Sequence, residues 1–432
     1  MLRSLAYILQ HSGLGPQIAP VLAEDGEKPT IIRTLFSQNL QHIVTLAGTF
    51  TKNKRLSSAC GDVVTAMLEA LSLRDFLDTV TELLKLPDDD LRRKILRLLG
   101  VRLGPNAERD TVSRNAVFEF IPVLIGIIQN SNDVLLKHAA ISCVDSISEA
   151  YGRKEPEKIA DVAQVIASDS CLGQSDDRLR IMGVLCLASM VEVIGQAIIR
   201  ALPNTLRRSS EILDISLQKG EENEELHNAV LSLYSALFVQ LPFMLSDKDL
   251  DKILLSCSRS ALSNLSQEGH EARRAILKLF GRKIDAKESF GAIERSWPNA
   301  VQCGAGATKE TLELLKLAIE KHTKSATVSN VNTLFQFFAK AFDLRREMAV
   351  YVNSDSKFSE MDVDGIETLT NDAAIKMIYK LNDTSFRPIF TKFVDWATNG
   401  LPKKDITGNL LRRTAFYRFL ETFFGTLKVS PY

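Results

Sequence analysis

The segment DLRRKILRLLG, residues 90–100, returns twice further along the chain and decides the fold. The second copy is DVLLKHAAISCV at 133–144, and the third is DDRLRIMGVLCLA at 176–188. Each copy places an acidic residue four positions before a basic one and continues with small and apolar residues at helical spacing: Asp90/Lys94, Asp133/Lys137 and Asp176/Arg180. Both steps between copies are 43 residues, from 90 to 133 and from 133 to 176. A repeat of this length predicts similar helical units stacked along the chain.

The repeat continues in a looser form toward the C-terminus. EELHNAVLSLYSALF begins at 224 and HEARRAILKLF at 270, which are steps of 48 and 46 residues from 176 and 224. A second helical segment precedes each copy, and two of these segments carry a proline near the start: IPVLIGIIQ at 121–129 and LPNTLRRSSEIL at 202–213. This arrangement resembles the HEAT repeat, a helix pair of about 40 to 47 residues. We therefore predict an all-α, HEAT-like α-solenoid with helical hairpin repeats of about 43–48 residues.

The repeated charged pairs are expected to have a structural role. The aspartate would cap the N-terminus of its helix, and the basic residue would link neighbouring repeats. We expect Leu98 and Leu185 to lie on the buried faces of their helices, where a charge would be costly. Alternating strand patterns are absent, and prolines are expected to divide the chain into helices of about 10 to 20 residues: Pro87, Pro105, Pro122, Pro156, Pro203 and Pro242.

Composition excludes several classes of protein. The 432 residues are 45% hydrophobic and 25% charged, and 53 basic residues balance 53 acidic ones, so net charge gives no strong nonspecific attraction to nucleic acid or membrane. The stretch 181–199 approaches membrane length, but Glu192 and Gln196 interrupt it and a buried helix is favoured. The cysteines are scattered singly, which predicts reduced, buried thiols: Cys60, Cys143, Cys171, Cys186, Cys257 and Cys303.

The sequence holds no recognisable catalytic motif. HExxH, GxSxG and CxxC patterns are absent, and the six histidines are widely spaced; His138 and His227 are expected to be core or groove residues. CGAGATKET at 303–311 lacks the spacing of a phosphate-binding loop, and EMDVDGIETLTN at 360–371 departs from a calcium loop at its first and last ligand positions, which favours an acidic, solvated loop. We expect no enzymatic activity, no cofactor, no metal and no small-molecule substrate.

Basic clusters are the remaining candidates for a binding surface. Most are expected to be solvated charges on the open faces of amphipathic helices, although in a solenoid they could align along an RNA backbone. The sequence alone does not distinguish direct RNA contact from solvated charge. The clusters are KNKR at 52–55, RRK at 92–94, Arg207-Arg208, Arg273-Arg274, Arg345-Arg346, KK at 403–404 and Arg412-Arg413.

The composition changes near Asn332, where the chain becomes rich in aromatic residues and less repetitive. In IYKLNDTSFRPIFTKFVDWA, residues 378–397, the apolar side chains fall at helical spacing and are expected to fill a core. Asp383 or Thr384 could cap a helix with Pro388 near its first turn. Arg387 is expected either to pair with Asp395 or to contact a partner. We predict two domains, a repeat array at 1–331 and an aromatic-rich helical domain at 332–432.

This last region resembles the C-terminal domain of the U3 small nucleolar RNA-associated protein ten family, which are nucleolar HEAT-repeat proteins. The resemblance covers about 100 residues and rests on short motifs: Phe342-Asp343-Leu344-Arg345, Leu381-Asn382-Asp383, Phe386-Arg387-Pro388, Phe390, Asp395-Trp396-Ala397, Arg413 and Phe416-Tyr417. Most of these are expected to be structural. The candidates for contact with a partner or RNA are Arg345, Arg346, Arg387, Arg412 and Arg413.

The resemblance implies a non-enzymatic scaffold of the small-subunit processome, the U3 ribonucleoprotein that processes pre-rRNA toward 18S rRNA. It implies a link to ribosomal DNA transcription by RNA polymerase I, a nucleolar location, other processome proteins as partners, and possible contact with pre-rRNA or U3 RNA. The chain is far shorter than family members and is expected to be the C-terminal part of such a protein. The rival interpretation is a karyopherin-like or coat-type transport adaptor, which the repeat pattern alone does not distinguish.

Overall fold

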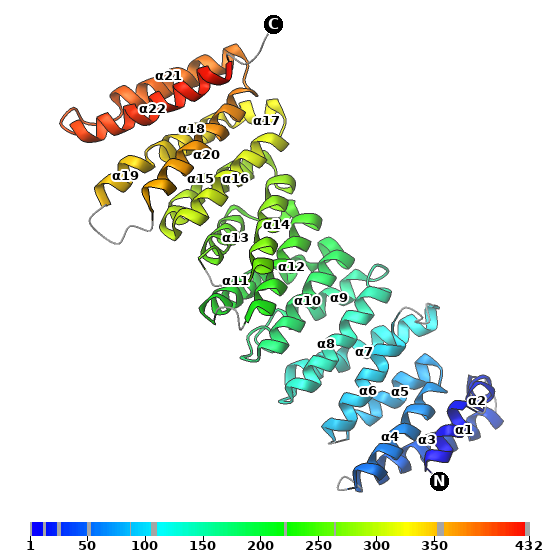
Figure 1. Ribbon diagram of the computed structural model, residues 1–432. Helices are drawn as coiled ribbons and strands as arrows, with labels where there is room; N and C mark the ends of the chain where they lie inside the picture. Colours follow the sequence, from blue (N-terminus) through cyan, green and yellow to red (C-terminus); the bar gives the residue numbers. More distant parts are fainter. Residues whose placement is uncertain are drawn as a thin grey trace. The chain divides into compact units, whose positions relative to one another are not determined.

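The computed structural model describes residues 2–11, 14–23, 27–49, 53–86, 88–104, 110–219, 223–262, 265–351 and 358–427. These residues form helices, turns and short connections, and none of them lies in a β-strand. The chain divides into two compact units, Met1–Arg208 and Ser209–Tyr432. The predicted all-α, HEAT-like solenoid is confirmed within each unit, where helices stack in pairs (Figure 1).

The first unit builds two rows of helices. One row contains α5, α7 and α9, and the other contains α4, α6, α8 and α10. Helices pack on their neighbours in each row, and α7 with α8 and α9 with α10 also pack on each other as pairs. The helices are α1 (Leu2–His11), α2 (Leu14–Ala23), α3 (Glu27–Thr49), α4 (Lys54–Glu69), α5 (Leu73–Leu83), α6 (Asp89–Arg102), α7 (Thr111–Asn130), α8 (Val134–Tyr151), α9 (Pro156–Ile166), α10 (Asp177–Ile194) and η1 (Gly195–Arg200).

The repeated aspartates begin these helices much as predicted. The carboxylate of Asp133 accepts hydrogen bonds from the backbone amides of Leu135 and Leu136 at 2.8 and 3.2 Å, and Asp176 caps α10 in the same way. The prediction is wrong for Asp90, because Asp88 is the N-cap of α6 and Asp90 lies within the first turn. Asn and Asp side chains at this position satisfy backbone amides that have no partner inside the helix.

Of the predicted basic residues, Lys137 links successive repeats as expected, whereas Arg180 pairs with Asp177 of its own helix at 3.3 Å. Lys137 is buried and its Nζ donates to the carbonyl of Ser170 at 2.9 Å, between α8 and the turn before α10. Arg93 Nε lies 3.7 Å from the carboxylate of Asp133, which joins α6 to the start of α8. These two contacts join α6 to α8 and α8 to the turn before α10.

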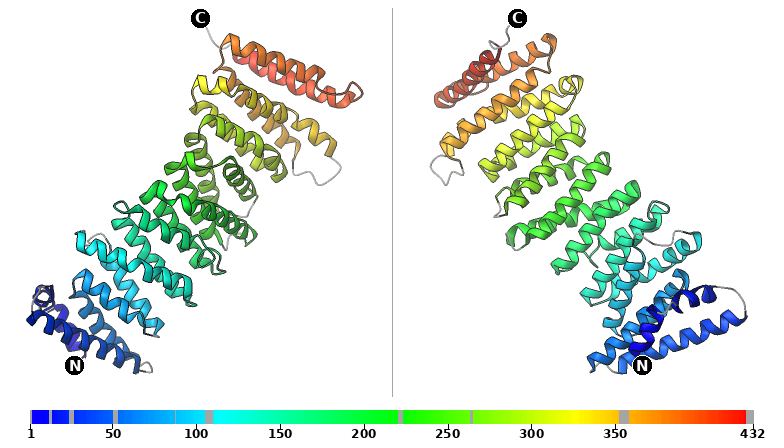
Figure 2. Two further views of the ribbon diagram at one scale, coloured as in Figure 1. Left: turned by 180° about the vertical axis from the view of Figure 1, so that it is seen from behind. Right: turned by 45° about the vertical axis from the view of Figure 1, so that its right-hand side comes forward.

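The second unit repeats the two-row pattern. α13, α15, α18 and α21 pack in one row, and α12, α14, α16, α20 and α22 pack in the other (Figure 2). Its helices are α11 (Leu202–Lys219), which begins just before the unit boundary, α12 (Glu224–Gln240), η3 (Pro242–Met244), α13 (Asp247–Ser260), α14 (Gln267–Lys283), α15 (Ala286–Cys303), α16 (Ala305–Lys321), α17 (Lys324–Ser329), α18 (Val331–Phe342), α19 (Leu344–Tyr351), α20 (Glu360–Ile378), α21 (Asp383–Asn399) and α22 (Ile406–Leu427). The domain boundary predicted near Asn332 falls at the start of α18, inside this unit, and stays a prediction.

Burial within the helices corrects two predictions. Leu185 is 42% exposed, and Leu98 is only half-buried, whereas Leu99 and Leu187 are fully buried. The repeat was identified correctly, but apolar residues recur so densely in these helices that their spacing does not define one buried face.

Pro122 differs from the prediction, whereas Gly304 separates two helices as expected. Pro122 lies inside α7 and does not end it, although the carbonyl four residues earlier loses its helical donor. Gly304, in the glycine-rich stretch 303–311, has φ 104° and joins α15 directly to α16. A backbone with this positive φ favours glycine, so Gly304 alone forms the tight turn, and residues 305–311 are already the first turns of α16.

The cysteines and the apolar helices belong to the core. All six cysteines are free and buried, as predicted, and burial raises the pKa of Cys143 to about 12, which leaves the thiol unreactive at neutral pH. Among the described residues, Thr111–Asn130 and Asp177–Arg200 are long and apolar enough to cross a membrane, and 44% and 50% of their windows are buried inside the structure. Core helices have the same composition, and α10 packs between α8 and α9.

Candidate interaction surface

The predicted contact residues converge on the last five helices. α22 packs against α18, α19, α20 and α21, so residues about 70 positions apart in sequence become neighbours. This arrangement separates the five candidate arginines into buried and exposed groups.

Arg412 and Asp343 form a buried ion pair. Both side chains are 7% exposed, and Arg412 Nε donates to Asp343 Oδ1 at 2.8 Å, with a second short bond from Nη2. Arg346 donates to the same carboxylate at 2.7 Å, and the Arg412 guanidinium lies 4.7 Å above the centre of the Trp396 ring. Burial opposes ionisation of Asp343, but the hydrogen bonds from Arg412 and Arg346 outweigh it and lower its pKa. The prediction of a partner contact is therefore wrong for Arg412, which instead fixes α22 to α18.

Arg345 is held in a second network. Its guanidinium donates to both carboxylate oxygens of Glu367 at 2.7 and 2.8 Å, and to Asp364. Arg418 donates to the same Glu367 at 2.7 Å. Hydrogen bonding to Glu367 raises the pKa of Arg345 further. With side chains 16% and 23% exposed, Arg345 and Arg346 are occupied mainly by internal carboxylates.

The acidic partners come from the segment predicted to be a loop. Residues 360–371 are instead the first turns of α20, which Ser359 and Asp362 begin with reciprocal capping hydrogen bonds. The loop prediction is wrong because the acidic residues have partners on adjacent helices. Lys309 Nζ on α16 donates to Asp362 at 2.7 Å and lowers its pKa to about 2, together with Ser359.

The aromatic residues form the expected core of this region. Phe342 is fully buried, and its ring centre lies 5.3 Å from that of Phe419 on α22 and 6.1 Å from that of Trp396 on α21. Phe386 and Phe390 are half-buried and pack with Phe423 and Phe416 of α22. Most aromatic residues of the segment 378–397 therefore join α21 to α22 and α18, although Tyr379 is 53% exposed.

The polar residues of α21 differ from the prediction in detail. Asn382 caps the helix by accepting from the amide of Ser385 at 2.9 Å, so neither Asp383 nor Thr384 is the cap. Arg387 is 77% exposed and pairs with Asp383, one turn earlier, instead of Asp395. Three further family-motif residues lie in or next to α21. Leu381 is half-buried, Pro388 is exposed inside α21, and Asp395 is exposed and accepts a hydrogen bond from Asn399.

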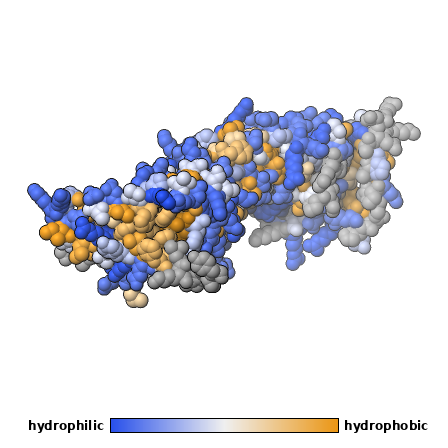
Figure 3. All heavy atoms as spheres, turned by 90° about the horizontal axis from the view of Figure 1, so that it is seen from above, coloured by the Kyte–Doolittle hydropathy of each residue, from blue (hydrophilic) through white to orange (hydrophobic). Residues whose placement is uncertain are grey.

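The exposed candidates lie on the α21–α22 hairpin. Arg413 follows the buried Arg412 but faces solvent. Around it, α22 exposes large apolar side chains at helical spacing: Ile406 at 78%, Leu410 at 64%, Tyr417 at 63% and Phe424 at 50%. Figure 3 looks down on this end of the second unit and shows hydrophobic atoms between hydrophilic ones. Arg387 and Arg413 are the predicted contact residues that the structure leaves most accessible.

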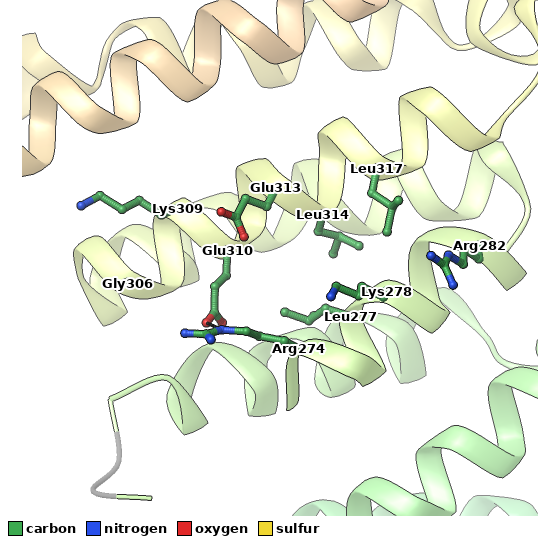
Figure 4. A pocket seen from close by; sticks show the side chains of 10 residues that line it. All are labelled: Arg274, Leu277, Lys278, Arg282, Gly306, Lys309, Glu310, Glu313, Leu314 and Leu317. Atoms are coloured by element: carbon green, nitrogen blue, oxygen red, sulfur yellow. Dashed lines mark hydrogen bonds and ion pairs between the residues drawn. The ribbon is translucent and has the colours of Figure 1, made fainter. Parts of the chain in front are cut away.

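A second surface, between α14 and α16, was not singled out from the sequence. It is a groove of about 550 Å³ that carries cations, carboxylates and leucines from both helices (Figure 4). Arg273, which the sequence placed on an open face, is only 2% exposed and bonds Glu310 at 2.6 Å beneath this groove. The sequence carried no signal for this groove, because Lys278 and Arg282 lie on α14 whereas Leu314 and Leu317 come from α16.

In the described part of the chain we find no cluster of side chains arranged for catalysis or metal binding. His227 is fully buried, as expected for a core histidine, and its Nε2 lies 2.7 Å from the hydroxyl of Ser260. Within the described ranges no group of three or more His, Cys, Asp or Glu side chains is placed to hold a metal ion.

The fold resembles that of karyopherins. The crystal structure of Kap121p bound to Nup53p aligns with a TM-score of 0.55 and 11% identity, covering 96% of this chain and 41% of that one. Kap121p bound to the SUMO protease Ulp1p aligns with a TM-score of 0.54 and 9% identity, covering 95% and 42% of the two chains. At this identity the similarity shows the fold alone, and together with the helix pairs it defines the chain as a HEAT-like α-solenoid.

Sequence relatives identify the family. The U3 small nucleolar RNA-associated protein 10 of Aspergillus fumigatus is 52% identical over 429 residues, and that of Aspergillus niger is also 52% identical over 429. The Coccidioides immitis protein of the same name is 44% identical over 430 residues. Each alignment covers 99% of this chain and 24% of the relative, so the chain spans about a quarter of their length. Residues 326–430 match the BP28CT (NUC211) domain. The chain belongs to the U3 small nucleolar RNA-associated protein 10 family.

Proposed function

We propose that this chain is part of a non-enzymatic scaffold of the small-subunit processome, the U3 ribonucleoprotein that processes pre-rRNA toward 18S rRNA. The observation that carries the proposal is 52% identity, over 429 of 432 residues, to proteins named for association with U3 small nucleolar RNA. The relatives are about four times as long, so the chain would supply one segment of a larger scaffold.

The surface is consistent with binding to several partners at once. Stacked helix pairs present a long series of exposed side chains on a fixed frame, and each position can contact a different molecule. Arg387 and Arg413 on the terminal hairpin are the proposed partner or RNA contacts, because their side chains are exposed while Arg412 is internal. The partners would be other processome proteins, with pre-rRNA or U3 RNA as a further candidate.

A nucleolar location and a link to transcription by RNA polymerase I complete the proposal. Both follow from the family resemblance. A tagged copy of the protein should concentrate in the nucleolus. Its depletion should lower both the labelling of nascent pre-rRNA and the processing of pre-rRNA. Normal nascent labelling with defective processing would remove the transcriptional link and leave the scaffold role.

The main test is replacement in a fungus that carries a close relative. In A. fumigatus the native protein would be placed under a repressible promoter, and its homologous segment would be exchanged for this chain in a rescue copy. On repression without rescue, northern blots should show unprocessed precursors and loss of 18S rRNA, while the large-subunit rRNA continues to form. If the 18S precursors were unchanged on repression without rescue, and the tagged protein gave a diffuse cytoplasmic signal, the proposal would be contradicted.

A transport adaptor is the second candidate, and the karyopherin-like fold is the observation that favours it. A receptor for basic cargo requires an acidic binding face. The α14–α16 groove instead combines four cations with two carboxylates, which favours a scaffold with mixed contacts. Binding of a lysine-rich import peptide by the purified chain, abolished by guanosine-triphosphate-loaded Ran, would support the adaptor.

A further inference from the structure

The groove between α14 and α16 has the size and lining of a peptide-binding site. Its volume is about 550 Å³, within the range of about 300–1,000 Å³ usual for ligand sites. Leu277 of α14 and Leu314 and Leu317 of α16 provide an apolar lining. The two helices pack along the same row of the second unit, so the backbone around the groove is fixed by the core beneath it.

The charges at one end of the groove are already neutralised. Arg274 Nε lies 3.2 Å from Glu310, which also bonds the buried Arg273. Lys309 Nζ lies 2.7 Å from Asp362 of α20. A ligand at this end would compete with existing ion pairs.

The other end carries two exposed cations. Lys278 and Arg282 are one turn apart on α14, and no ion pair links either of them to another described residue. Figure 4 shows them on α14 below Leu314 and Leu317 of α16, while the Arg274–Glu310 pair lies toward the opposite end. Cations beside an apolar lining match a ligand that carries both carboxylates and apolar side chains.

The same lining disfavours RNA. A single-stranded RNA site combines a basic track with aromatic side chains on which bases stack. This groove presents leucines in place of aromatic rings, and the exposed carboxylate of Glu313 would repel phosphates. Glu313 would also set the direction of a bound peptide. The acidic residues of the peptide would lie near Lys278 and Arg282, and its neutral or basic residues would lie near Glu313.

We propose that the α14–α16 groove binds an acidic, apolar peptide segment of a partner protein, with its carboxylates on Lys278 and Arg282 and its apolar side chains on Leu277, Leu314 and Leu317. The proposal deepens the scaffold function above by naming the chemistry of one partner. It rests on that function only for the partner's biological role, because binding itself can be measured with the purified chain.

The test uses a random 16-residue peptide library displayed on phage and selected on the purified 432-residue chain. Selection would be repeated on Lys278→Glu/Arg282→Glu and on the control Lys283→Glu/Lys287→Glu. The control makes the same change in charge at exposed positions nearby that do not line the groove. Circular dichroism and thermal melting would verify that both variants fold.

Peptides selected on the unaltered chain should combine acidic residues with leucine-like side chains. They should bind Lys278→Glu/Arg282→Glu at least about tenfold more weakly and the control variant with nearly unchanged affinity. Leu317→Asp should also weaken binding, which ties the site to the groove lining.

Three results would overturn the proposal. Selected peptides could be basic, could bind both double variants equally, or could be displaced by a 15-nucleotide oligouridine whose own binding depends on Lys278 and Arg282. The last result would make the groove an RNA site. None of them affects the rRNA phenotype on depletion, so failure of this proposal is distinguishable from failure of the scaffold function.

Discussion

At the scale of single residues, Arg412 and Arg413 show how neighbours in sequence acquire opposite roles. Arg412 is buried against Asp343 and Trp396, while Arg413 points to solvent. A helix turns by about 100° per residue, which is enough to place Arg412 on the buried face of α22 and Arg413 outside it. Burial of one arginine in such a pair therefore does not define the role of the other.

Arg412→Ala should destabilise the α18–α22 region, since it removes the main partner of a buried carboxylate. Loss of one partner from a buried pair costs about 3 to 5 kcal/mol, and the lower end is expected because Arg346 still contacts Asp343. Hydrogen exchange of α22 should report the loss. Arg413→Ala is the control and should change stability by no more than about 0.5 kcal/mol. Equal protection in both variants would contradict the internal role of Arg412.

His227 predicts a pH dependence of stability. Burial lowers its pKa below the ordinary value of about 6.5, with a further contribution from the charge of Arg273. The unfolded chain therefore binds a proton at a pH where the folded chain does not, and stability falls as pH decreases below about 6.5.

Thermal melting between pH 7.5 and 5.5 should show this decrease, and His227→Gln should reduce its slope. The exposed His42 is the matched control, and His42→Gln should leave the slope unchanged. Some slope should remain in His227→Gln, because burial also lowers the pKa of His138, His270 and His322. An unaltered slope in His227→Gln would show that the buried ring is not the sensor.

At the scale of the helix, α10 illustrates how one repeat is held. Leu187 is fully buried and Leu185 is 42% exposed, two positions apart in the same apolar run. Complete burial of a leucine contributes about 1.5 to 3 kcal/mol. The core of the first unit therefore depends on the face of α10 that meets α8 and α9.

Leu187→Asp should unfold the repeats around α10, because an unpaired carboxylate in the core costs several kcal/mol. Leu185→Asp should have a much smaller effect, since its side chain already reaches solvent. Limited proteolysis and thermal melting of the purified chain would compare the two. Similar losses in both variants would mean that the two leucines are equally buried in solution.

At the scale of the whole molecule, the buried residues of stacked repeats determine stability, and the exposed residues determine binding. Each helix pair contacts mainly its neighbours, so a core defect spreads along the stack while a surface change stays local. The equal numbers of basic and acidic residues, 53 and 53, also mean that binding must come from local surfaces and not from net charge.

Variants in the A. fumigatus exchange strain should therefore fall into two classes. Leu187→Asp should lower the abundance of the protein, as measured by immunoblot. Arg387→Glu/Arg413→Glu should leave abundance unchanged but reduce co-purification of U3 RNA, because both side chains are exposed. Lys403→Glu/Lys404→Glu, also exposed, makes the same change in charge and is the control. Equal co-purification in both surface variants would exclude Arg387 and Arg413 as contacts.

The sequence by itself determined the fold class and the family. Helical periodicity and the 43-residue step depend on local spacing, and the positions of Asp133 and Asp176 mark helix starts because capping is a local interaction. The aromatic motifs after Asn332 were also sufficient to indicate the family.

Only the tertiary structure decided which charges are internal and which are available. Arg345 meets Glu367 across 22 residues, Arg412 meets Asp343 across 69, and residues 360–371 are helical with partners on α16 and α19. Such pairs depend on which helices become neighbours, and spacing along one helix carries no information about that. The α14–α16 groove arises for the same reason, because α14 supplies Lys278 and Arg282 and α16 completes its apolar lining.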